Sequence, residues 1–111
     1  MTTEQVNKAE EFIIFCESEF FTGTHSVSFI TKDLQTRKAS DRYSTLGSNS
    51  RQTNLLSAKK QVYFETFNNV YNGINLYLNM LQKSYPNHAL ISRCERCKEQ
   101  IEKLRNIVQD F

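Results

Sequence analysis

Apolar residues recur at alternating steps of three and four along three long segments of the chain. A spacing of about 3.5 residues places each set on one face of an α-helix. The three sets, which we call seams, are Val6, Ala9, Ile13, Cys16 and Phe20; then Tyr63, Phe67, Val70, Ile74, Tyr77 and Leu81; and then Leu90, Cys94, Cys97, Ile101, Leu104, Val108 and Phe111. The pattern predicts three amphipathic helices whose apolar faces pack together.

Turn-forming and capping residues place the three helices at about 3–21, 54–84 and 88–111. The last two are joined by a short connection, in which Pro86 disfavours helical geometry at the preceding residue and Asn87 can cap the following helix. Two long helices joined so closely lie antiparallel. We therefore expect an all-α helical bundle that forms one domain over all 111 residues.

Gly73 lies in the middle of the longest predicted helix. Glycine weakens a helix there by about 1 kcal/mol relative to alanine. A close approach by another helix would explain a residue without a side chain at this position, and a kink is the alternative explanation.

The connection between the first two predicted helices, residues 22–53, has no sustained hydrophobic period. Between 31 and 54, 12 of 24 residues are Ser, Thr, Asn or Gln, and a Gly-Ser-Asn-Ser run at 47–50 is typical of a turn or linker. We therefore expect an irregular, mobile insert that holds at most one short helix or hairpin. The insert is also basic: residues 31–60 hold seven Lys or Arg against two Asp, whereas residues 1–22 hold five Glu against one Lys.

The basic residues between 32 and 60 suggest nucleic-acid binding as an alternative function, because Lys and Arg neutralise phosphates. Two observations argue against it: the charges are spread over the whole segment, and the net charge of the chain is only +2. A solvated face, or contact with the acidic first helix, is the competing interpretation. The candidate nucleic-acid contacts are Arg37, Lys38, Arg42 and Arg51.

Cys94 and Cys97 form a C-x-x-C pair, the one motif here with recognised chemistry. A zinc site needs four ligands, and the remaining soft ligands, Cys16, His25 and His88, form no second pair. Because both sulfurs of the pair fall on the C-terminal seam, we expect buried, free thiols and neither a metal nor a cofactor. A thiol or metal protein that uses Cys94 and Cys97 is a remote alternative.

Several absences bear on location and activity. The chain has no secretory signal and no apolar run of ~20 residues, and its cysteine count is odd, which predicts an intracellular, cytoplasmic protein that does not enter the membrane. The sequence also lacks a glycine-rich phosphate loop and any nucleophile–base constellation. We therefore expect neither enzymatic activity nor a small-molecule substrate.

A regular stripe of amide side chains lies beside the apolar seam of the longest predicted helix. Surface helices ordinarily carry Lys or Glu at such positions, since both are better helix formers than Asn. An uncharged helix face that can form hydrogen bonds is typical of the centre of an interface. The predicted partner-binding residues are Asn68, Asn72, Asn75, Asn79 and Gln82.

These features favour a non-enzymatic protein-protein interaction module that acts through its helix faces. An adaptor, an assembly subunit, a chaperone-like binder and a small regulatory inhibitor of a larger machine all fit this description. The expected partner is another protein or a second copy of the chain in a coiled-coil-like homodimer. Aromatic residues beyond those the seams need support this, because exposed apolar patches mark interfaces. They include Phe12, Phe15, Phe21, Phe64 and Tyr71.

Overall fold

The computed structural model describes residues 1–46 and 55–111, without the side chains of 43–46. The described part consists of helices and short turns and contains no β-strand. The elements are α1 (Thr3–Glu17), the five-residue π-helix η1 (Ser18–Thr22), α2 (Val27–Leu46), α3 (Leu55–Ser84) and α4 (Leu90–Gln109). The predicted all-α bundle is confirmed.

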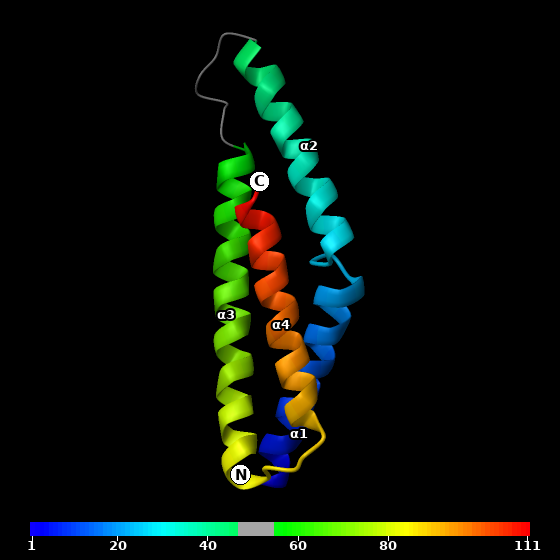
Figure 1. Ribbon diagram of the computed structural model, residues 1–111, viewed down its shortest axis with the longest axis vertical. Coiled ribbons are helices and arrows are strands. Elements are labelled where there is room, and N and C mark those ends of the chain that lie inside the picture. Colours follow the sequence, from blue (N-terminus) through cyan, green and yellow to red (C-terminus); the bar gives the residue numbers. More distant parts are fainter. Residues whose placement is uncertain (47–54) are drawn as a thin grey trace.

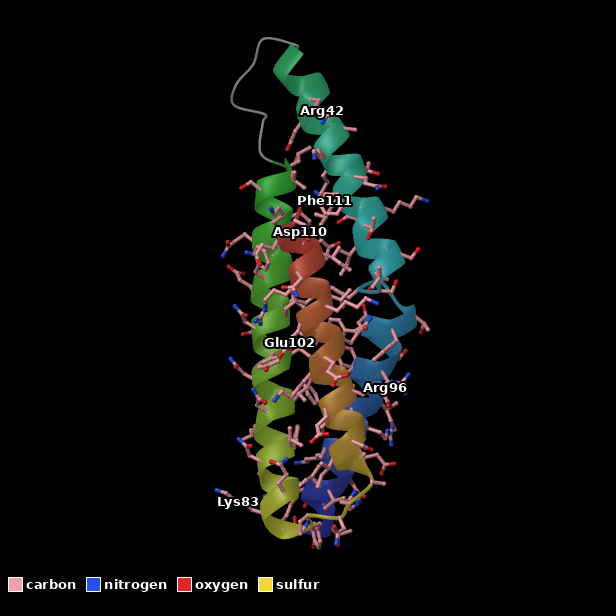
Figure 2. The ribbon with its side chains drawn as sticks, in the orientation of Figure 1. Arg42, Lys83, Arg96, Glu102, Asp110 and Phe111 are labelled. Carbon is pink, nitrogen blue, oxygen red and sulfur yellow. The ribbon has the colours of Figure 1, made fainter. Side chains whose placement is uncertain are left out.

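The helices form a rod of 59 × 21 × 20 Å. Helices α3 and α4 make an antiparallel hairpin, and α1 and α2 follow one another along it (Figure 1). In Figure 2, Asp110 and Phe111 lie lower in the view than Arg42, so the last turns of α2 extend beyond the end of α4. No helix in the described part of the chain is both long and apolar enough to cross a membrane.

Side chains bind the free backbone N–H groups where α1 and α3 begin. Thr2 and Gln5 form a capping box, in which each side chain accepts a hydrogen bond from the backbone N–H of the other residue. The Asp41 carboxylate of α2 accepts hydrogen bonds from the backbone N–H groups of Leu55 (2.9 Å) and Leu56 (3.0 Å). The carboxylate also suits the positive end of the helix dipole, so α2 caps α3.

The start of α4 differs from the expectation. Asn87 does not cap this helix, which begins at Leu90 and not at about 88. The Leu90 backbone N–H donates instead to Nδ1 of His88 over 3.1 Å. The imidazole of His88 therefore satisfies the N–H group that Asn87 was expected to satisfy.

Helix α2 has 20 residues, so the expectation of an irregular insert with at most one short element is wrong for residues 27–46. Ile30 and Leu34 are fully buried against the hairpin. The Ser26 hydroxyl accepts a hydrogen bond from the Phe29 backbone N–H over 3.3 Å and so helps α2 begin. Packing against the hairpin outweighs the polar composition of this segment. The Gly-Ser-Asn-Ser run lies outside the described residues.

The seams form the core of the rod. Six members of the C-terminal seam, from Leu90 to Val108, are at most 3% exposed. On α3, Leu78 is buried next to Ile74, so the buried face is broader than the predicted seam. A Cβ atom at Gly73 would lie 2.8 Å from the ring of Phe12 on α1, which confirms close approach as the reason for glycine at this position.

Candidate functional site

The five predicted partner-binding residues lie along one side of α3 but do not share one environment. Asn75 is half-buried, and Asn68 Oδ1 accepts a hydrogen bond from Arg105 of α4 over 2.8 Å. The N-terminal end of the stripe, at Asn68, therefore contacts α4, whereas most of its later residues face solvent. Its other three members, all exposed, are Asn72, Asn79 and Gln82.

An exposed leucine lies in the middle of these amides. Leu76 is 59% exposed, the largest exposed fraction among the large apolar side chains of the described residues. Asn72 lies one turn before it and Asn79 one turn after it on the same helix face. No charged residue occurs between 66 and 82, so amide and apolar groups alone make up this surface. We call it the amide face, and its residues are Asn72, Asn75, Leu76, Asn79 and Gln82.

Charged residues of α4 border the amide face. The Tyr71 hydroxyl donates to Glu102 over 2.9 Å, and the charged groups of Lys98 and Arg105 lie 5.3 and 5.5 Å from the centroid of the Tyr71 ring. Figure 2 shows Glu102 on α4 beside α3. These contacts hold the α4 charges at the edge and leave the amide face itself uncharged.

Three of the four residues of the alternative nucleic-acid surface, Arg37, Lys38 and Arg42, lie in the second half of α2. Arg37 Nε donates to Asp33 Oδ1 over 3.0 Å, one turn earlier on α2, so its charge is already paired. Lys38 and Arg42 are exposed, with Arg42 near the far end of α2 (Figure 2). Arg51 lies outside the described residues. Among the three candidate residues that the structure describes, only Lys38 and Arg42 are therefore exposed without an ion pair to another described residue, which is few for a surface that tracks a phosphate backbone.

Cys16, Cys94 and Cys97 are free and buried. Burial raises the pKa of Cys16 to about 12 and the pKa values of Cys94 and Cys97 to about 11. Each thiol is therefore protonated at neutral pH, which makes it a weak nucleophile and a weak metal ligand. No group of three or more His, Cys, Asp or Glu side chains in the described residues is arranged to hold a metal ion. The sulfurs act as core packing.

Polar contacts that the sequence did not indicate hold the corner between α1 and α2. Glu19 of η1 accepts a hydrogen bond from the Thr24 hydroxyl, and its Oε1 lies 2.6 Å from His25 Nδ1. Both contacts lower the pKa of Glu19 below its usual value, and the hydrogen bond from Thr24 contributes most. Glu17 accepts two hydrogen bonds from Arg93 of α4, at 3.0 and 2.5 Å, which lower the pKa of Glu17. The Glu19 carboxylate therefore stabilises the turn between α1 and α2, and the Glu17 carboxylate links α1 to α4.

Most of the surplus aromatic residues do not form an exposed patch. Phe12, Phe21, Phe64 and Tyr71 are partly buried and pack against the core. Phe15 is the exception, with 52% of its surface exposed. A further exposed ring, Phe29 of α2, was not singled out by the sequence pattern and is 50% exposed.

No protein-family model, no curated protein and no solved structure matches this chain. A function for the chain must therefore be argued from its own surface. The described surface offers two candidates: the amide face of α3, and the exposed rings of Phe15 and Phe29 on either side of the turn between α1 and α2.

Proposed function

We propose that the chain is a non-enzymatic protein-binding module that docks a partner protein on the amide face of α3. The observation that carries this proposal is an exposed Leu76 flanked by Asn72 and Asn79 on a helix segment without charge. Interface centres are depleted in charge and consist of apolar anchors surrounded by contacts that exclude water. An adaptor, an assembly subunit, a chaperone-like binder and a small inhibitor are the roles that this proposal covers.

The energetics of the helix support the same proposal. Each exposed Asn costs some tenths of a kcal/mol of helix stability relative to Lys or Glu. On a helix face that contacts only solvent, no other interaction offsets this loss of helix stability. A face that docks a partner gains a donor and an acceptor in every amide, and an amide costs much less to desolvate than a charged group.

Replacing single amides by charged residues should block docking and leave the fold intact. We expect Asn72→Lys and Asn79→Glu, made separately, to weaken partner binding at least about tenfold, because each buries a charge without a counter-ion. Both positions are exposed and both new residues are better helix formers, so the melting temperature should stay the same or rise. The measurement is capture of the partner from cells that make the protein, followed by titration with the purified partner.

A matched pair of variants on α2 separates this proposal from nucleic-acid binding. Lys38→Gln and Arg42→Gln remove exposed charges and should leave capture unchanged, and the captured material should survive nuclease treatment. Nucleic-acid binding would instead be lost in these variants and would weaken steeply with salt. If the α2 variants lose the bound material while the Asn variants retain it, the amide face is not the binding surface.

A further inference from the structure

A second exposed surface lies where α1 turns into α2. Phe15 is 52% exposed and Phe29 50% exposed, although phenylalanine is usually buried. The Phe15 ring meets the buried Phe20 edge-on, with 6.5 Å between ring centroids, so the core beneath it is already filled. We call Phe15, Phe29 and their charged neighbours Glu11 and Lys32 the corner surface.

Both exposed rings lie on the side of α1 and α2 that is next to α3. Phe15 is one turn after Phe12, whose ring packs against α3. Phe29 is one turn before Asp33, which accepts a hydrogen bond from Tyr63 of α3 over 2.6 Å. Residues three or four apart share a helix face, so the two rings lie on the same side of the rod.

Charges of opposite sign flank the two rings. Glu11 lies one turn before Phe15, and Lys32 lies one turn after Phe29, each on the same face as its ring. Both charged side chains are exposed, and neither forms an ion pair within residues 1–46 and 55–111. Along the chain, an acidic residue and then a ring therefore precede the turn, and a ring and then a basic residue follow it.

We propose that the corner surface binds a second copy of this chain in antiparallel orientation, about a two-fold axis near Thr22. Phe15 lies seven residues before Thr22 and Phe29 seven after it, while Glu11 lies eleven before and Lys32 ten after. The two-fold axis brings Phe15 of each copy opposite Phe29 of the other copy. It also brings Glu11 of each copy opposite Lys32 of the other copy. A two-fold interface requires this kind of self-complementary surface.

The shape of the rod suits this pairing. Figure 1 shows the corner about halfway along the long axis, so antiparallel copies overlap over most of their length. One long face of a rod of 59 × 21 Å offers on the order of 1,200 Å², compared with the roughly 800 Å² per partner of a standard interface. The pairing also places the acidic residues 1–22 of each copy beside the basic α2 of the other.

Charge reversal tests the proposal in the full chain by sedimentation. The wild type should be a dimer at micromolar concentration. Glu11→Lys alone and Lys32→Glu alone should each raise the dimer Kd at least about tenfold, because each places like charges together twice in the dimer. The double variant, Glu11→Lys with Lys32→Glu, should restore the wild-type Kd, because opposite charges face each other again.

Control variants distinguish this interface from other causes of association. Glu95→Lys changes an exposed charge on α4 and should leave the Kd unchanged. Phe29→Asp should give a monomer that remains folded by circular dichroism. A wild-type monomer at hundreds of micromolar would overturn the proposal, as would a dimer that ignores the single reversals or is not restored by the double one. Dissociation by Asn72→Lys alone would place the contact on the amide face instead.

Discussion

Phe67→Ala should lower the free energy of unfolding by about 3–5 kcal/mol and the melting temperature by more than about 10 °C. Phe67 is fully buried, and its ring centroid lies 6.3 Å from that of Phe20 and 6.0 Å from that of Tyr63. Because Phe20 comes from η1 and Tyr63 from α3, the truncation opens a cavity where the first helix meets the hairpin. Urea unfolding followed by circular dichroism measures the loss.

Phe29→Ala is the matched control, because it removes the same atoms from a ring that is 50% exposed. Measured at concentrations where the chain is monomeric, it should cost less than about 1 kcal/mol. Equal losses of stability in the two variants would show that Phe67 is not a central core residue.

Raising the pH from about 8 to about 10.5 should destabilise the protein by roughly 2 kcal/mol for each buried thiol. Burial raises the pKa of Cys16 from 9.0 to about 12, and the pKa values of Cys94 and Cys97 from 9.0 to about 11. A group whose folded-state pKa is raised contributes its full stability below the unfolded-state pKa and loses it as the pH rises through the folded-state value. The loss therefore begins near pH 9 and is complete near pH 12.

The control for this effect is a variant in which Cys16, Cys94 and Cys97 are all alanine. It should be less stable than the wild type at about pH 8, because the smaller side chains leave cavities. Its stability should then fall much less between the two pH values, as measured by denaturant titration at each pH. An equal fall in both proteins would show that other groups titrate and that the thiols are not buried.

The fold was predictable where the hydrophobic period is long. Between Leu90 and Val108 a single spacing continues without interruption, and only a helix buried on one side satisfies it. Gly73 was informative for a related reason, since a residue without a side chain in a long helix indicates that something lies close to it. That neighbour proved to be Phe12.

Helix α2 was not predictable, because its stability comes from distant residues. Ile30 and Leu34 are its only fully buried apolar side chains among the described ones, which is too few to establish a period. The Asp33 carboxylate accepts a hydrogen bond from Tyr63, 30 residues away, and Asp41 caps the start of α3. Local sequence patterns carry no information about such contacts.

The candidate site was predictable only in part. The spacing of the amides was visible in the sequence, but the exposure of Leu76 depends on which side of α3 the other helices cover. The pairing of Arg37 with Asp33, which weakens the nucleic-acid alternative, depends on side-chain geometry. Phe29 belongs to no seam, and its exposure became evident only once α2 was placed on the hairpin.

Site-specific photocrosslinking in the cells that make the protein tests the central proposal, that the amide face of α3 binds a partner protein. A photoreactive amino acid is placed at position 72 on the amide face and, in a second variant, at position 39, an exposed residue of α2. Our account predicts a discrete, nuclease-resistant protein adduct from position 72 and none from position 39. An adduct to nucleic acid from position 39, with no protein adduct from position 72, would contradict it.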